Sequence, residues 1–194
     1  MEAAVEQTVW DVIALYLRQG YLHILPMGLD HILFVLALFF ASTRLKPLIW
    51  QISAFTLAHT LTLGLATLGY LRLDPAIVEP IIALSIAFVA IENLVFKDMT
   101  RWRPAIVFGF GLFHGLGFAG VLADYGLPQD QILPSLLSFN VGVEAGQLTI
   151  IGTCWLILHR FADADWYPWL VRLASGAIAL MALWWTVERV FLGG

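Results

Sequence analysis

The sequence predicts an all-α, polytopic membrane protein with six transmembrane helices preceded by a short interfacial helix. Of its 194 residues, 60% are hydrophobic and only 12% are charged, whereas a soluble domain has about 25% charged residues. The mean hydropathy of +0.85 indicates more apolar surface than one core can bury. The apolar residues also fall into segments close to the ~20 residues that a bilayer requires. We therefore expect residues 1–194 to form a single integral membrane domain.

The first predicted element, residues 7–22, is amphipathic. Its apolar residues recur at helical spacing on one side, whereas Asp11 and Arg18 lie elsewhere. This segment is too short and too polar to span a membrane, so we predict a helix that lies in the interface. Pro26 and Gly28 then redirect the chain.

Six apolar segments follow, separated by short polar or proline-containing loops. The predicted spans are about 24–42, 48–69, 77–96, 104–123, 134–158 and 167–191. Basic residues in short loops predict their orientation, because cytoplasmic loops are enriched in lysine and arginine. One side holds Arg44, Lys46, Lys97, Arg101, Arg103 and Arg160. The other side holds only Arg18, Arg72 and Arg189. The first side is therefore predicted to be cytoplasmic, and both termini to be periplasmic if the membrane is a bacterial inner membrane.

Composition also narrows the partners of the protein. The lipid bilayer is the first expected partner, and the formal net charge of −4 argues against nucleic acid. The single cysteine, Cys154, cannot form an internal disulfide or a thiolate metal cluster. The sequence does not predict an oligomeric state.

Ionisable residues stand at the mouth of the first span, where His23, Asp30 and His31 precede a purely apolar run. Such groups are costly in lipid and are functional candidates by default. Counting from the helix end places Asp30 and His31 in the outer third of the membrane. We expect these two residues to form the entrance of a polar path, with His23 as a further candidate metal ligand that flanks them.

Further imidazole and carboxyl groups are predicted deeper in the membrane. His59, His114 and Glu144 fall near the middle of their spans, and Glu92 falls in the inner third of its span. Neutral imidazole and carboxylate oxygen are suitable ligands for nickel, cobalt and zinc. We therefore predict a column of metal ligands across the membrane, although each member alone could make only a structural hydrogen bond. The predicted supporting polar residues are Asn93, Asn140, Gln147, Thr56 and Ser85.

Two further patterns concern helix packing. Gly111 and Gly115, like Gly142 and Gly146, are four residues apart, a spacing that allows helices to approach closely. The pattern Phe-x-Leu-x-His-x-Leu occurs at residues 55–61 and again at 110–116, and a glutamate follows each copy in the next span. This internal similarity predicts a tandem helix-hairpin repeat, with spans two and three matching spans four and five. Apolar composition alone can also produce such a match.

The chain resembles the HupE/UreJ family of hydrogenase and urease accessory membrane proteins, in particular its second branch. The matching runs are HILPMGLDHILFVLAL, FTLAHTLTLGLA, IALSIAFVAIENL, FGFGLFHGLGFAG and FNVGVEAGQ. They cover nearly all of residues 23–147 in order. The resemblance implies a nickel or cobalt permease, with Asp30, His31 and His114 at matching positions.

The leading functional hypothesis is therefore a permease for a divalent transition-metal ion, nickel or cobalt, rather than an enzyme. Without a nucleotide-binding motif, transport would be driven by the membrane potential. The alternative is an intramembrane zinc-dependent hydrolase, in which three histidines hold Zn²⁺ and leave a position open for water. A single tetrahedral site beside a lipid-accessible cleft favours the hydrolase, and several partial sites along a path favour the permease. A third interpretation is a metal sensor or an assembly partner.

Overall fold

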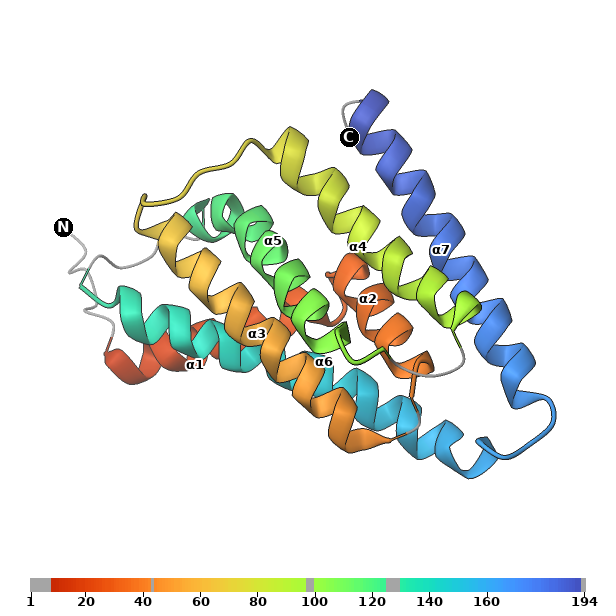
Figure 1. Cartoon of the computed structure of the whole chain (residues 1–194). Helices are drawn as coiled ribbons and strands as arrows, with labels where there is room; N and C mark the ends of the chain where they lie inside the picture. Colours follow the sequence, from red (N-terminus) through yellow and green to blue (C-terminus); the bar gives the residue numbers. More distant parts are fainter. Residues whose placement is uncertain (1–7, 43, 97–99, 125–129, 193–194) are drawn as a thin grey trace.

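The computed structural model describes residues 8–42, 44–96, 100–124 and 130–192, and in these ranges the protein is entirely helical (Figure 1). The all-α prediction is thus confirmed. The elements are α1 (Val9–Ile24), α2 (Leu29–Phe40), α3 (Leu45–Thr67), α4 (Pro75–Val95), α5 (Arg103–Asp124), α6 (Ile132–Leu158), the 3-10 helix η1 (His159–Phe161) and α7 (Tyr167–Phe191). The predicted loop residue Lys97 lies outside the described residues.

Four helices are long and apolar enough to cross a membrane: α3, α4, α6 extended by η1, and α7. A fifth span results if α1 and α2 are taken together as one broken span. Helix α5 covers the predicted span 104–123 but is not among these candidates. The structure therefore supports a membrane protein with four or five candidate spans in its described part, and the count of six is not confirmed.

The first predicted span, 24–42, is not one continuous helix. Helix α1 ends at Ile24, α2 begins at Leu29, and the two are bent by 68°. The cause is local, because a residue before proline is forced into an extended conformation, and Leu25 has φ −124° and ψ 115°. The 12 residues of α2 extend only about 18 Å, which is too short to cross a bilayer.

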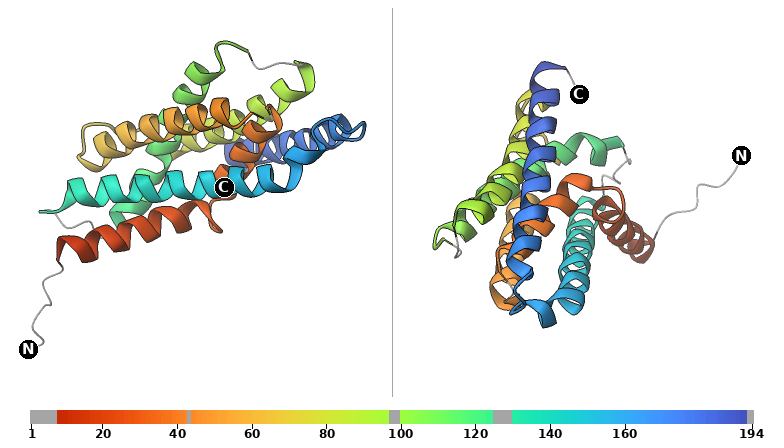
Figure 2. Two further views of the ribbon diagram at one scale, coloured as in Figure 1. Left: turned by 90° about the horizontal axis from the view of Figure 1, so that it is seen from below. Right: turned by 90° about the vertical axis from the view of Figure 1, so that its right-hand side faces the viewer.

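Helix α1 packs along α6 (Figure 2). Its amphipathic sequence predicts a helix in the membrane interface, and this packing against a span was not predicted. The contact depends on glycines of both helices. A Cβ atom at Gly20 would overlap the carbonyl oxygen of Phe139, and one at Gly142 would overlap the carbonyl oxygen of Leu17. The predicted close approach at Gly142 is therefore confirmed, and it sets the distance of α1 from the rest of the bundle.

The same kind of contact joins α3 and α5. A Cβ at Gly111 would meet the backbone of Phe55, and one at Gly115 would overlap the carbonyl oxygen of His59. Two histidine-bearing helices are thereby held side by side and parallel. The predicted hairpin repeat is not confirmed, because among the described residues α3 makes no more than marginal contact with α4, and α5 no more with α6.

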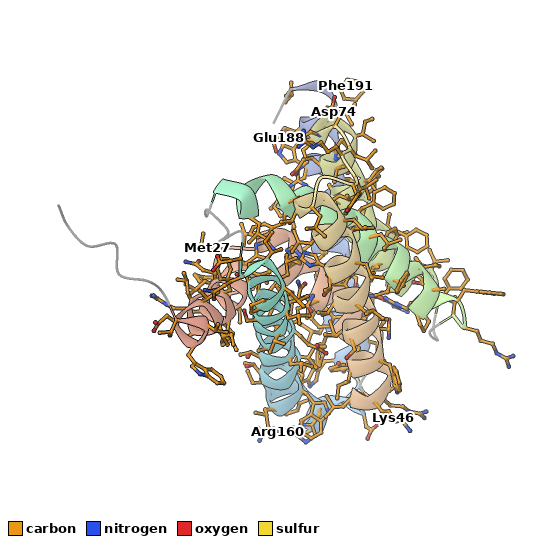
Figure 3. All side chains as sticks on the ribbon, turned by 90° about the vertical axis from the view of Figure 1, so that its left-hand side faces the viewer. Met27, Lys46, Asp74, Arg160, Glu188 and Phe191 are labelled. Carbon is orange, nitrogen blue, oxygen red and sulfur yellow. The ribbon has the colours of Figure 1, made fainter. Side chains whose placement is uncertain are left out.

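The two ends of the bundle differ in charge. Lys46 and Arg160 lie at one end, which we call the basic end, and Asp74 and Glu188 lie at the opposite, acidic end (Figure 3). The short α2 lies inside the bundle and packs against α4 and α6 (Figure 1). Met27, in the α1–α2 break, lies between the two ends (Figure 3). The break therefore interrupts the helix at residues 25–28, of which Pro26 and Met27 are exposed.

Replacing Gly142 by alanine is expected to lower the free energy of unfolding by about 1–3 kcal/mol, because the added methyl group meets backbone that cannot move aside cheaply. Thermal unfolding of the purified protein measures the effect. Gly152 on the same helix is the matched control, since a Cβ there has no neighbour within 4 Å. Equal stability of both variants would contradict the role given to Gly142.

Candidate metal centre

Four imidazole rings meet inside the bundle, one from each of four helices. His23 lies in α1, His31 in α2, His59 in α3 and His114 in α5. The ring of His31 is central, with centroid distances of 4.7 Å to His23, 6.1 Å to His59 and 5.0 Å to His114. We call these four residues the histidine cluster. All four were predicted to be metal ligands, His23 and His31 near the outer face and His59 and His114 near the middle of the membrane, and the structure brings their rings together.

The α1–α2 break places His23 inside the cluster, although the sequence suggested that it only flanks the site. His23 lies in the last turn of α1 and His31 in the first turn of α2. The intervening turn is tight, because a Cβ at Gly28 would overlap the carbonyl oxygen of His23. A glycine at this position therefore allows the two imidazoles to face each other.

Each ring of the cluster has a buried nitrogen that has no hydrogen-bond partner among the described residues. These atoms are Nε2 of His23, Nε2 of His31, Nε2 of His59 and Nδ1 of His114. An unsatisfied buried polar atom costs about 1–3 kcal/mol, so four such atoms in one place are unlike an ordinary structural core. They indicate a site that a ligand with electron-pair acceptor character would complete.

Asn140 on α6 orients the ring of His59. Its amide nitrogen donates to the carbonyl oxygen of Leu136 at 2.8 Å, which turns the amide oxygen towards His59. Nδ1 of His59 lies 2.9 Å from this oxygen and must donate to it. The proton of the neutral ring is thereby held on Nδ1, and Nε2 keeps the lone pair that a metal requires.

Ser85 on α4 acts in the same way on His114. Its hydroxyl donates to the carbonyl oxygen of Ile82 at 2.6 Å, so the single hydroxyl proton is used. The hydroxyl oxygen therefore accepts from Nε2 of His114 at 3.0 Å. The lone pair of this ring lies on the unpartnered Nδ1. Asn140 and Ser85, predicted only as supporting polar residues, thus contact cluster rings directly.

The positions of the nitrogens fit a divalent transition-metal ion. One ligand atom each of His23, His31 and His59 lies within 4.8 Å of the others. A point within about 2.8 Å of all three therefore exists, and shifts of about 0.7 Å would bring them to the 2.0–2.1 Å of a metal–imidazole bond. The three residues come from different helices, so small rearrangements of side chains can tighten or loosen the group.

Phenylalanines surround the cluster and keep its environment apolar. Phe118 lies 3.8 Å from His23 between ring centroids, and Phe139 lies 5.7 Å from it. On the other side, Phe34 and Phe55 contact His114 at 5.3 and 4.9 Å. Both side chains are fully buried. Because burying an unpaired charge in such surroundings is costly, carboxylates nearby would favour the binding of a cation by the rings.

Two carboxylates that can balance the charge of a cation line a pocket of about 470 Å³ that reaches the cluster. His23, His31 and His114 form its inner wall, and Asp30 and Glu79 line it as well. Met27, which is 67% exposed, also lines it. Arg189 bridges the two carboxylates, with Nη2 2.8 Å from Oδ2 of Asp30 and Nη1 3.3 Å from Oε2 of Glu79.

Sequence reasoning missed Glu79 and treated Arg189 only as a charge in the orientation count. The sequence contained a feature that could have identified both residues, namely their position about one turn inside a predicted span. Glu79 lies in the second turn of α4 and Arg189 in the last turn of α7. Ionisable residues a turn inside a predicted span are functional candidates, and these two are on different helices that pack together.

Glu144 lies outside the histidine cluster. Ser53 donates to its Oε1 at 2.6 Å, which ties α3 to α6. One turn away, Thr56 donates to the amide oxygen of Gln147 at 3.1 Å. These residues form a polar seam between the two helices, on the side of the cluster towards the basic end. Their predicted participation in one path with the histidines stays a prediction.

Glu92 and Asn93 form a third, separate group. Glu92 is paired with Arg103, with Nε and Oε2 3.5 Å apart, and also accepts from Thr100 at 2.8 Å. Asn93 accepts from Nη2 of Arg103 at 3.2 Å and donates to the carbonyl oxygen of Ala37 at 2.8 Å. Glu92, Asn93 and Arg103 line a cavity of about 540 Å³. The structure therefore divides the predicted single column into three separate polar groups: the histidine cluster, the seam that contains Glu144 and the group that contains Glu92.

Asn140→Ala is expected to weaken Ni²⁺ binding about 10- to 100-fold, because outer-shell partners that orient a histidine ligand have effects of this size. Isothermal titration of the purified protein with Ni²⁺ measures it. Gln147→Ala on the same helix is the control, since its amide bonds Thr56 and not a histidine. Equal losses in the two variants would show that Asn140 acts only through helix packing.

Together, the fold and the site define a helical membrane protein with a cluster of imidazole ligands in its interior. A family model described as HupE / UreJ protein matches residues 1–189, and the chain belongs to the HupE/UreJ family. Comparisons with curated proteins and with solved structures gave no match. Membership in this family suggests a role in the handling or transport of nickel or cobalt, and the histidine cluster is a group that can bind metal.

Proposed function

We propose that the protein is a transmembrane permease for a divalent transition-metal ion, nickel or cobalt, which the histidine cluster holds as substrate. The observation that carries this proposal is the set of four unpartnered buried ring nitrogens. Three of the four rings line a pocket with carboxylates at its mouth. Neutral imidazole suits nickel, cobalt and zinc, and the apolar surroundings offer no hard oxygen cage for calcium or magnesium.

Transport would follow the order of the polar groups. The ion is captured at Asp30 and His31 and is then bound by the cluster. From there it moves past Glu144 towards Glu92 at the far cavity. A membrane potential of 100 mV supplies ~2.3 kcal/mol per elementary charge. The loose spacing of the cluster nitrogens supports this proposal, because a conducted ion must also leave each site.

The proposed location is the inner membrane of a bacterium, with the whole chain forming one membrane domain. The acidic end faces the periplasm, together with both termini. Support for this orientation comes from the basic residues Lys46 and Arg160 at the opposite end of the bundle (Figure 3). The ion therefore enters the cell through the protein.

Uptake of Ni²⁺ and Co²⁺ into proteoliposomes tests the proposal. We expect accumulation above that of protein-free liposomes, and more accumulation under an inside-negative potassium diffusion potential. A metal-responsive dye inside the vesicles reports the ion. Absence of uptake for both ions, with protein that is folded and reconstituted, would overturn the permease assignment.

One observation also favours a zinc-dependent hydrolase as a second candidate. His23, His31 and His59 offer three imidazole ligand atoms in one group, and three imidazoles with an open fourth position are the donor set of catalytic zinc sites. Tight binding of a single Zn²⁺ without transport of any divalent ion would favour this candidate. Rapid exchange and net flux of the ion favour the permease.

A further inference from the structure

The mouth of the pocket contains a positive charge at the place where a cation would first bind. Arg189 donates to Oδ2 of Asp30 at 2.8 Å and to the carbonyl oxygen of Glu79 at 3.1 Å. Its guanidinium also lies 3.3 Å from Oε2 of Glu79. The side chains of Arg189 and Asp30 are 17% and 23% exposed and that of Glu79 is 40% exposed, so the group is partly buried and open to the pocket on the side of Glu79.

This charge lies on the route to the histidine cluster. Arg189, Asp30 and Glu79 line the same pocket as His31 and His114. Those two rings are almost completely buried, and each has an unpartnered nitrogen. A cation that enters this pocket therefore meets the carboxylates that the guanidinium occupies.

We propose that Arg189 determines specificity as a built-in counter-cation, which a divalent ion displaces from Asp30 and Glu79 and a monovalent ion does not. This inference rests on the proposed function. It assigns to Arg189 and Glu79 the discrimination between divalent transition-metal ions and the far more abundant monovalent cations.

The discrimination follows from charge. A divalent ion has twice the Coulomb energy of a guanidinium with the same two carboxylates at equal distance. Potassium or sodium has only the same charge, and it would replace charge-assisted hydrogen bonds that a guanidinium makes with good geometry. Without the arginine, two carboxylates beside an apolar cavity would attract any small cation.

Besides the two carboxylates, Arg189 also has an aromatic ring beside it, which can retain the side chain when an ion displaces it. The guanidinium carbon of Arg189 lies 5.6 Å from the centroid of the Trp185 ring, which also lines the pocket. An aromatic face within about 6 Å attracts a cation. Arg189 can therefore leave the carboxylates without leaving the pocket wall and return when the ion has moved to the histidines.

The test is Ni²⁺ titration of the full-length protein at constant ionic strength, with either potassium or the bulky cation N-methyl-D-glucamine as the counter-ion. We expect the wild-type Kd to be the same in both buffers. In Arg189→Gln, the Kd without potassium should fall at least about tenfold, because a competitor held by charged hydrogen bonds is gone. Potassium should then raise the Kd again.

Arg172→Gln is the matched control, because Arg172 also lies over a tryptophan, at 5.3 Å from Trp169, but lines the other cavity. It should behave like wild type. Arg189→Lys keeps the charge and should keep the insensitivity to potassium. If Arg189→Gln does not fold, Glu79→Gln replaces it and should raise the Ni²⁺ Kd at least about tenfold with little change in thermal stability.

The outcomes separate the two proposals. Wild-type protein that binds Ni²⁺, with an Arg189→Gln variant that has the same Kd and the same insensitivity to potassium, would overturn the role of Arg189 alone. The same holds for a Glu79→Gln variant that loses stability without any change of Kd. Wild-type protein that binds neither Ni²⁺ nor Co²⁺ would overturn the proposed function itself.

Discussion

His31→Ala is expected to abolish Ni²⁺ uptake into proteoliposomes and to weaken Ni²⁺ binding by more than about 100-fold. The loss should exceed the 10- to 100-fold effect of outer-shell changes, because the ring of His31 is the centre of the cluster. It lies within 6.1 Å of the rings of His23, His59 and His114, measured between centroids. Titration calorimetry and vesicle uptake measure the two effects.

The structure offers a matched control and a second variant for this test. His159→Ala removes an imidazole that stacks on Trp155 at 4.0 Å and is exposed outside the cluster, so metal binding should not change. His31→Phe removes the ligand atoms but keeps an aromatic ring in the same space, so it separates the loss of a metal ligand from a loss of packing. Retention of wild-type Ni²⁺ affinity in both His31 variants would exclude the cluster as the binding site.

Arg103→Met is expected to lower the free energy of unfolding by about 3–5 kcal/mol, because removal of one partner leaves a buried charge without compensation. The carboxylate of Glu92 is 5% exposed and the side chain of Arg103 is 2% exposed. The variant also removes the donor to Asn93, which ties α4 to α2 through Ala37. Thermal or denaturant unfolding of the purified protein measures the loss.

The double variant Glu92→Gln with Arg103→Met should recover most of this stability, since no unpaired charge remains. Arg101→Met, at an exposed position nearby, is the control and should have little effect. If Arg103→Met keeps full stability, the pair does not hold the basic end of the bundle together. Uptake by the double variant then tests whether Glu92 also serves the ion path.

Much of the fold follows from local patterns that a single sequence contains. Apolar segments of membrane length predict the helices, and the structure places α3, α4, α6 and α7 close to their predicted bounds. The glycine pairs predict close helix contacts, because a missing Cβ allows backbones to approach, and the structure makes these contacts between α5 and α3 and between α6 and α1. Short sequence segments between residues 23 and 147 were also enough to predict the family, which a family model over residues 1–189 confirms.

The candidate site was only partly predictable. The sequence identifies His31, His59 and His114 as the chemically important imidazoles, with His23 as a flanking candidate, because ionisable groups inside apolar spans are costly. It orders them by depth along their own helices, which is all that residue counting can measure. Which side chains face each other depends also on the rotation and tilt of each helix. Counting therefore joined Glu144 and Glu92 to the same column, whereas their contacts are with Ser53 and Arg103.

The sequence by itself thus determined the membrane class, the positions of most helices and the imidazole chemistry. The tertiary structure decided that His23 joins the cluster and that Arg189 pairs with Asp30 and Glu79 at its mouth. The physical reason is the distance over which each property acts. Hydropathy and helical periodicity are properties of neighbouring residues, whereas the α1–α2 bend and the packing of α7 on α4 bring together residues up to 159 positions apart.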